Sequence, residues 1–210
     1  MAFAKQIKTE TGIIGIWELS ESAEQLITKF RFLRIEKEEF NKLNIEKRKI
    51  EYLAIRLLLE KMLGRKEQLN YGKKGNPLIK DSILHISISH SAELAVVFIS
   101  EKSAGIDAEN IFRNTYRVAR RYLSDPEYQT AMSSKHPALS RIMYWSAKEA
   151  IFKCTPEQEI SFTEQIKIFP FNIKNEGEIS GRLETKEKRR NFDCRYLFYG
   201  NNVIVYCVER

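Results

Sequence analysis

The chain has 210 residues, enough for one domain or two small ones, and with 43% hydrophobic and 30% charged residues its composition excludes a disordered protein. It carries 35 basic against 28 acidic side chains, a formal net charge of +7, which suits an anionic partner such as nucleic acid, a phosphorylated small molecule or an acidic protein. Its three cysteines have neither the spacing of a zinc site nor that of a disulfide framework. The first residues lack the apolar core of a signal peptide, and no apolar run approaches the ~18 residues that span a bilayer. We therefore expect a cytoplasmic protein.

The first half of the chain predicts a strand followed by helices. Residues 12–19 are rich in β-branched and aromatic side chains, which favours a strand, and Ser20 is placed to cap a helix after it. Residues 45–63 predict a longer helix, with Asn44 as its N-cap and Gly64 just past its end.

Basic side chains gather early in this second helix. Lys47, Arg48 and Lys49 are consecutive, and Arg56 lies further along. Such a cluster is either a solvated helix face or an anion-binding surface, and both interpretations stay open.

Short strands follow a turn-forming segment at residues 71–77. We expect them in the ranges 78–79, 83–89, 94–99 and 104–109. In the last of these, Asp107 and Glu109 are two residues apart, so both carboxylates point to the same side of the strand. Two adjacent carboxylates repel each other, and a cation between them relieves the repulsion; the alternative is a polar strand end in water.

In the second half, residues 110–138 are polar and predict short helices and loops, and a helix is expected around Trp145. Strands are then predicted at 162–171, 177–183, 193–199 and 203–208, with a hairpin turn at 200–202. This layout predicts an α+β fold of two similar halves, residues 1–103 and 104–210, each a small antiparallel sheet with helices packed on it.

The helix around Trp145 has a notable face. Residues 145–153 contain no Gly or Pro, and Trp145, Glu149 and Lys153 follow each other at one-turn spacing. A carboxylate is thus held one turn from an ammonium group. The alternative is an ordinary helix with a buried Trp and a surface Glu–Lys pair.

Taken together, Gly-Ile-Asp-Ala-Glu at 105–109 and Trp-Ser-Ala-Lys-Glu-Ala-Ile-Phe-Lys at 145–153 resemble the two signature motifs of the 4′-phosphopantetheinyl transferases. The closest class is the surfactin type, a single chain with two pseudo-symmetric halves. Ile-Ser-His-Ser at 88–91 is similar to a third motif and Gly-Asn-Pro-Leu at 75–78 to a fourth. The matches run in family order over residues 47–153, about half the chain.

The resemblance implies an enzyme that moves phosphopantetheine from coenzyme A to a serine of an acyl or peptidyl carrier protein and releases 3′,5′-ADP. Such a reaction needs charge neutralisation on the diphosphate, positioning, and removal of the serine proton. By residue-to-residue match, Asp107, Glu109 and Glu149 are expected to hold Mg²⁺, with Glu149 also the candidate general base. Lys153 is expected to bind the diphosphate.

The resemblance also implies a set of coenzyme A contacts. They are Arg48, Arg56, Lys74, Asn76, Pro77, Ser89, His90, Lys148 and Lys153. For His90 the alternative is a loop histidine with a satisfied hydrogen bond. The family usually has Lys between Gly75 and Pro77, where this chain has Asn76, and Lys74 or Lys73 is a candidate to replace that charge.

A basic protein is suited to an acidic carrier protein, and residues 113–141 are our candidate for the docking face, on a monomer with an internal pseudo-two-fold. Two other functions stay open. A nucleic-acid-binding module would explain the charge but not the paired carboxylates, and another Mg²⁺-dependent phosphoryl-transfer enzyme would explain the carboxylates but not the motif order. The choice between carriers of lipid and of secondary-metabolite biosynthesis also stays open.

Overall fold

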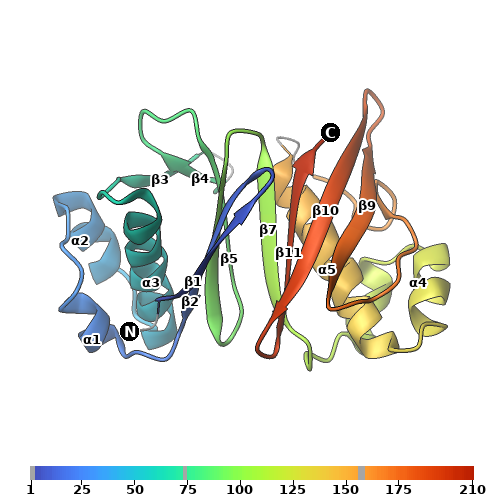
Figure 1. Ribbon diagram of the computed structural model, residues 1–210, viewed down its shortest axis with the longest axis horizontal. Coiled ribbons are helices and arrows are strands. Elements are labelled where there is room, and N and C mark those ends of the chain that lie inside the picture. Colours follow the sequence, from blue (N-terminus) through green and yellow to red (C-terminus); the bar gives the residue numbers. More distant parts are fainter. Residues whose placement is uncertain (1–2, 73–74, 156–158) are drawn as a thin grey trace.

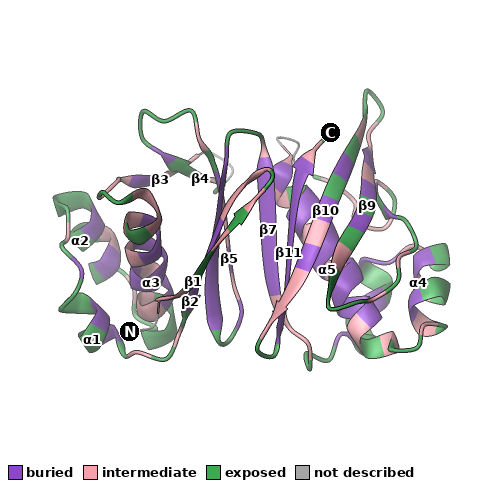
Figure 2. Ribbon diagram, in the orientation of Figure 1, coloured by how far each residue is buried: buried purple, intermediate pink, exposed green. Residues whose placement is uncertain are grey.

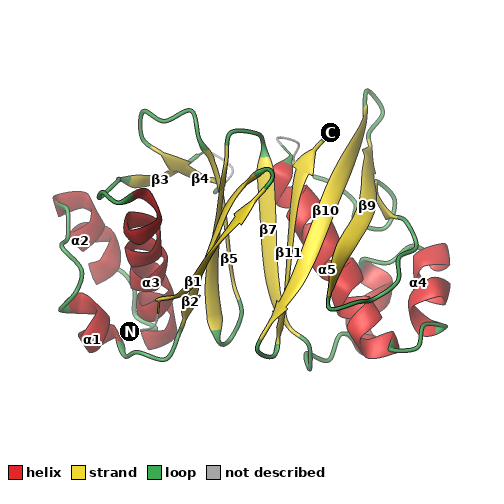
Figure 3. Ribbon diagram, viewed as in Figure 1, coloured by secondary structure: helices red, strands yellow, loops and turns green. Residues whose placement is uncertain are grey.

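A computed structural model of the chain describes residues 3–72, 75–155 and 159–210. Within these residues the strands form two antiparallel sheets that lie side by side, with helices on the outer face of each (Figures 1 and 3). The predicted α+β fold with two similar halves is confirmed.

The first sheet has the strand order β1-β2-β6-β5-β4-β3 in the described part of the chain. Its strands are β1 (Phe3–Thr9), β2 (Gly12–Glu18), β3 (Leu69–Tyr71), β4 (Pro77–Ile79), β5 (His85–His90) and β6 (Leu94–Ser100). Strand β1 was not predicted; its burial pattern is mostly intermediate and exposed, so it lacks the apolar signal of β2.

Helices α1 (Ala23–Ile27), α2 (Arg34–Asn41) and α3 (Glu46–Leu63) pack on the outer face of this sheet. Helix α3 ends at Leu63, and Gly64 follows directly with a left-handed φ of 69°, as predicted. The predicted N-caps are wrong. Ile45, not Asn44, precedes α3, and Ser22, not Ser20, caps α1 through a capping box with Gln25.

The second sheet has the order β7-β11-β10-β9-β8 among the residues described. Its strands are β7 (Ala104–Asn110), β8 (Ile166–Ile168), β9 (Glu176–Glu184), β10 (Arg189–Tyr199) and β11 (Asn202–Glu209). Strand β8 is therefore shorter than predicted: of the residues 162–171 expected in a strand, only 166–168 form one.

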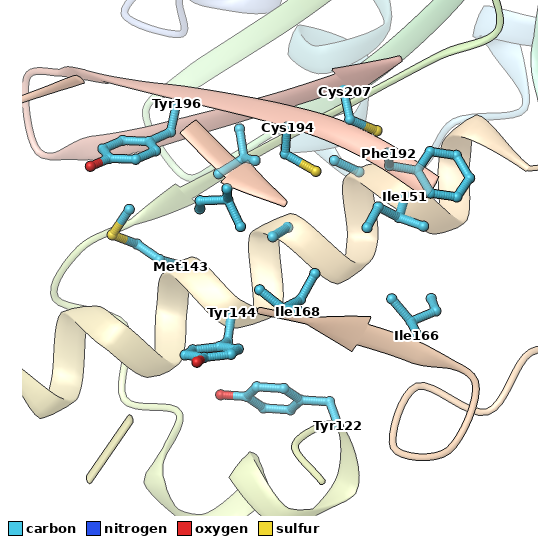
Figure 4. Close-up of a cluster of buried hydrophobic side chains, with 14 of the residues drawn as sticks. Tyr122, Met143, Tyr144, Ile151, Ile166, Ile168, Phe192, Cys194, Tyr196 and Cys207 are labelled. Atoms are coloured by element: carbon cyan, nitrogen blue, oxygen red, sulfur yellow. The ribbon is translucent and has the colours of Figure 1, made fainter. Parts of the chain in front are cut away.

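Helix α5 (Pro137–Cys154) covers the outer face of the second sheet, with α4 (Asp125–Met132) and a short 3₁₀ helix, η1 (Tyr116–Arg121), beside it. Met143 and Ile151 of α5 point toward the sheet and lie in one buried cluster with Phe192 and Tyr196 of β10 (Figure 4). This apolar face fixes how α5 rotates about its axis, and so which of its side chains face elsewhere.

A separate apolar layer joins the two sheets. Ile14, Val96 and Phe98 of the first sheet pack against Ile106 and Ile204 of the second, all of them fully buried (Figure 2). At the border of this layer the Ser87 and Ser89 hydroxyls of β5 accept hydrogen bonds from the backbone N–H groups of β7, at Ile106 (3.0 Å) and Ala108 (3.3 Å). Strands β5 and β7 are thereby held next to each other.

The described strands of the first sheet end at Ser100 and those of the second begin at Ala104. The assignment of two separate domains, 1–103 and 104–210, stays a prediction. Among the residues described, no helix combines the length and the apolar character that a membrane span requires.

Candidate active site

The site is built where α5 lies directly on β7. A Cβ atom on Gly105 would come within 1.8 Å of the Ala150 carbonyl oxygen, so only glycine allows the helix backbone to approach the strand this closely. This approach places Glu149 and Lys153, at one-turn spacing, beside the Asp107 carboxylate of β7.

The Lys153 ammonium group is the cation at the centre of the site. Its Nζ lies 2.9 Å from Asp107 Oδ1, 3.1 Å from Ser89 Oγ and 3.0 Å from the Ile106 carbonyl oxygen. The Ser89 hydroxyl also donates to Asp107 Oδ1 at 2.9 Å. One oxygen of the buried Asp107 carboxylate is therefore fully engaged. The other, Oδ2, is buried without a hydrogen-bond partner among the described residues.

Glu109 is held by different partners. It accepts a hydrogen bond of 2.8 Å from the Trp145 indole Nε1 and pairs with Arg113. The Trp145 ring packs edge-on against Tyr122, with ring centroids 5.0 Å apart. The tryptophan predicted at the start of the motif thus positions a carboxylate from the other motif.

The three carboxylates form a negatively charged group despite these cations. Burial, followed by the charge of Asp107, raises the pKa of Glu149 to about 7. The same two causes raise the pKa of Glu109 above its ordinary value. Glu109 and Glu149 are thus harder to ionise, first because they are buried and second because the Asp107 carboxylate is near, and a bound cation relieves this condition.

The predicted magnesium set is not preassembled. In the described residues, no three His, Cys, Asp or Glu side chains are arranged to hold a metal ion, because Asp107 is engaged by Lys153, and Glu109 by Trp145 and Arg113. The donors nevertheless fit such an ion: Mg²⁺ prefers carboxylate oxygens, and Asp107 Oδ2 is a buried acceptor without a donor. Asp107, Glu109 and Glu149 as metal ligands stay a prediction.

A cleft of about 450 Å³, here called the His90 cleft, opens beside these carboxylates. It is lined by Lys47, His90, Ser91, Ala92, Glu109, Asn110, Phe112 and Arg113. Arg48, one of the predicted coenzyme A contacts, lies at its border with Nη1 3.4 Å from His90 Nε2. The structure therefore brings the basic start of α3 to the end of β5, and both to Glu109 of β7.

Lys148, predicted to contact coenzyme A, is turned inward in this structure, and the contact stays a prediction. Its side chain is 0% exposed and its Nζ donates to Glu127 Oε2 (2.7 Å), the Phe162 carbonyl (2.6 Å) and the Ile166 carbonyl (2.6 Å). With all three donors used in the interior, Lys148 ties α5 to α4 and to the chain around β8. Burial is the main cause that lowers the pKa of its ammonium group.

Two further predicted contacts are turned inward. Arg56 is buried, lies over the Tyr52 ring and pairs with Glu36 and Glu39. The Ser89 hydroxyl is buried and donates to Asp107 while accepting from Lys153 and the Ala108 N–H, so its donor and both acceptor positions are used. In this structure both residues support their neighbours, and their contacts with coenzyme A stay predictions.

The fourth motif lies away from His90. Pro77 begins β4, which pairs with β5 at Leu78 and His85, at the opposite end of β5 from His90. His90 lies five positions after His85 along the strand, roughly 17 Å away. Asn76 closes its own turn against Gly72. Lys74 lies outside the described residues, and contacts of Asn76 and Pro77 with coenzyme A stay predictions.

Sequence reasoning missed Glu51 and Glu127, the two buried carboxylates behind the site. Glu51 pairs with Lys47, Arg48 and His90, and Glu127 with Lys148. Glu51 could have been predicted from the sequence, because it lies four residues after Lys47 and three after Arg48, the spacings at which side chains on a helix form ion pairs. No local pattern links Glu127 to Lys148, which is 21 residues away.

Comparison with known proteins gives a consistent result. Residues 103–207 match the family model described as the 4′-phosphopantetheinyl transferase superfamily. The chain is 29% identical over 128 residues to 4′-phosphopantetheinyl transferase psf-1 of Bacillus pumilus, a match that covers 58% of this chain and 53% of that protein. It is 24% identical over 139 residues to 4′-phosphopantetheinyl transferase Sfp of Bacillus subtilis (strain 168), covering 60% of each. The matched stretch thus spans little more than half the length of either relative.

Proposed function

Since the chain belongs to the 4′-phosphopantetheinyl transferase superfamily, we propose that it transfers 4′-phosphopantetheine from coenzyme A to a serine of an acyl or peptidyl carrier protein. The two named relatives support this activity. The observation that carries the proposal is the pairing of Asp107 with Lys153 beside Glu149, at the border between the two sheets and next to the His90 cleft.

The reaction is an exchange at phosphorus. The carrier serine oxygen attacks the phosphorus that bears pantetheine, a new P–O bond forms, and the bond to the bridging diphosphate oxygen breaks. The products are the phosphopantetheinylated serine and 3′,5′-ADP. The serine proton must leave as the oxygen attacks.

Glu149 is the proposed general base. Its pKa of about 7 makes it a better proton acceptor near neutral pH than an ordinary glutamate. Lys153, one turn further along α5, is the proposed ligand of the diphosphate. Its ammonium group already donates to Asp107 and Ser89, so a diphosphate must share these donors with them.

Asp107, Glu109 and Glu149 would hold a divalent ion such as Mg²⁺, which when bound neutralises charge on the diphosphate. Asp107 would offer Oδ2, the oxygen that Lys153 and Ser89 leave unused. The positive charge of the bound ion would then offset the repulsion between the three carboxylates.

Coenzyme A is the proposed occupant of the His90 cleft, where Lys47 and Arg48 supply positive charge and hydrogen-bond donors beside His90. Phe112, which lines this cleft, is 75% exposed, and Tyr116, four residues later, is 57% exposed. Three arginines belong to the same segment: Arg113, Arg117 and Arg121. Apolar side chains among cations suit an acidic carrier protein, so we place carrier docking on this segment.

The experiment that tests the function is a transfer assay. The protein is incubated with coenzyme A, Mg²⁺ and apo carrier proteins of fatty-acid, polyketide and peptide synthesis, and the carriers are weighed by mass spectrometry. A carrier is expected to gain the mass of one phosphopantetheine only when its acceptor serine is present. A panel that stays unmodified at high enzyme concentration would overturn the proposal.

A further inference from the structure

Three charged or titratable side chains from two elements meet at the border of the His90 cleft. Glu51 of α3 is 3% exposed and lies behind His90 of β5, with Oε1 3.3 Å from His90 Nδ1. Its other oxygen, Oε2, accepts from Arg48 Nη1 at 3.1 Å. Arg48 Nη1 in turn lies 3.4 Å from His90 Nε2. A single buried carboxylate thus connects the two side chains that border the cleft.

These contacts fix the protonation of the His90 ring. A guanidinium group can only donate, so His90 Nε2 must be the acceptor and carries no proton. The ring proton is then on Nδ1, which lies 3.3 Å from Glu51 Oε1. In this form the only ring N–H is on the side of Glu51, and His90 has no second N–H to donate to an anion in the cleft.

Adding one proton to Nε2 changes both contacts at once. An imidazolium ring cannot accept from Arg48, so Arg48 Nη1 loses its contact with His90 and keeps only the one to Glu51, and Nε2–H becomes a new donor. The contact of Nδ1–H with Glu51 is kept and becomes charge-assisted. The cleft then gains one donor and one positive charge from a single protonation.

The charged groups that act on His90 come from two helices. Glu51, Arg48 and Lys47 lie on α3 and Lys153 lies on α5. Burial is the largest cause that lowers the pKa of His90, the three cations lower it further, and Glu51 alone of these four groups raises it. Glu51 therefore decides whether the ring can become charged next to three cations.

We propose that Glu51 is a positioning residue that allows His90 to take up a proton from solvent when the phosphate group of a nucleotide enters the cleft, so that protonated His90 and Arg48 bind it together. This rests on the proposed function only in that coenzyme A is the source of the phosphate. No bond to carbon or phosphorus is formed or broken in this step.

The probe is 3′,5′-ADP, and the first readout is the ring itself. The chain has three histidines, so the ¹⁵N–¹H spectrum of the imidazole groups is assigned for His90 with the variant His90→Gln. The free protein at neutral pH is expected to show the Nδ1–H form, and saturation with 3′,5′-ADP is expected to protonate both nitrogens. Calorimetry in buffers of different ionisation enthalpy should show an uptake of about one proton per nucleotide.

The second readout is the pH profile of 3′,5′-ADP affinity. In the wild type the affinity should rise as the pH falls through the titration of His90. Glu51→Gln should shift this rise to lower pH by about one unit, so that binding at neutral pH weakens about tenfold. His90→Gln should abolish the rise. Glu60→Gln removes the same charge from the same helix, nine residues or roughly 13 Å away, and should keep the wild-type profile.

The opposite outcomes overturn the inference. They are a free protein with its His90 proton on Nε2, no nucleotide binding, binding without proton uptake, or a Glu51→Gln profile that matches the wild type. The simple removal of a negative charge from an anion site predicts tighter binding at every pH, which also contradicts the positioning role. Carriers that stay unmodified while 3′,5′-ADP binds with proton uptake would refute the transfer reaction and leave this inference standing.

Discussion

The Lys153 ammonium group lies 2.9 Å from the Asp107 carboxylate, so the chain itself supplies the central cation of the site. All three Nζ protons have acceptors, in Asp107, Ser89 and the Ile106 carbonyl. A diphosphate that binds Lys153 must therefore compete with groups of the protein, and a divalent ion must approach Asp107 from the side of Oδ2.

Lys153→Gln is expected to destabilise the metal-free protein, because the buried Asp107 carboxylate loses its cation. The cost should be about 1–3 kcal/mol, below the ~3–5 kcal/mol of a fully buried pair, since the lysine side chain is 26% exposed. Urea unfolding in EDTA measures it, and Mg²⁺ should restore more stability to this variant than to the wild type. Lys167→Gln, which breaks an exposed pair with Glu184, is the control and should change little. Equal stability of both variants would contradict this view of Asp107.

Asp107→Asn is expected to reduce phosphopantetheine transfer at least about a hundredfold, because it removes charge from the oxygens that face Lys153 and the proposed ion. The amide has nearly the same shape, so circular dichroism should stay close to wild type, while the melting temperature should fall because the pair with Lys153 is lost. Rates come from mass spectrometry of the carrier. A variant with normal turnover would show that Asp107 is not a ligand of the reaction.

Lys148→Met is expected to cost roughly 3–5 kcal/mol of stability, because Glu127 would be left as a buried carboxylate without its cation. Nucleotide affinity of the folded protein should not change, since the Lys148 side chain is fully buried. The double variant with Glu127→Gln should recover part of the loss. Weaker nucleotide binding with normal stability would restore the contact role predicted from the sequence.

The stability of the metal-free protein should fall as the pH rises toward 8. The pKa of Glu149 is about 7 in the folded state against an ordinary value of 4.5, so the folded state binds this proton more tightly than the unfolded state. Its contribution is fully present below about 4.5 and is lost as the pH rises through about 7. Mg²⁺ should therefore raise the melting temperature more at pH 8 than at pH 5.5, and an equal rise at both would contradict a shared ion.

Gly105→Ala is expected to separate α5 from β7, because the new Cβ would lie 1.8 Å from the Ala150 carbonyl oxygen and neither backbone can yield locally. Overpacking of this kind costs about 1–3 kcal/mol or more, and turnover should fall with it as Glu149 and Lys153 move from Asp107. Unfolding curves and the transfer assay measure the two effects. Normal activity would show that the site tolerates a wider spacing.

The sequence predicted which segments build the site because the information there is local. Helical spacing placed Trp145, Glu149 and Lys153 on one face, and strand alternation placed Asp107 and Glu109 on one side. The structure adds that Glu109 accepts from Trp145 and that Asp107 pairs with Lys153.

What sequence could not predict is which lysines and arginines turn inward. Lys148 lies four residues after Tyr144 and three before Ile151, both fully buried, so it belongs to the core face of α5. Arg56 is likewise three residues before Leu59 and faces inward on α3. A motif match gives the residue types but does not say which side of a helix faces the core. The carboxylates that make the burial of these cations possible, Glu127 for Lys148 and Glu36 for Arg56, are distant in the chain.

The serine hydroxyls between the sheets have a consequence for the behaviour of the protein in concentrated solution. Strand β7 is at the edge of its sheet, and a bare edge invites pairing with a strand of another molecule. Ser87 and Ser89 occupy the N–H groups of Ile106 and Ala108 on that edge. The strand that carries Asp107 is thereby shielded from intermolecular aggregation.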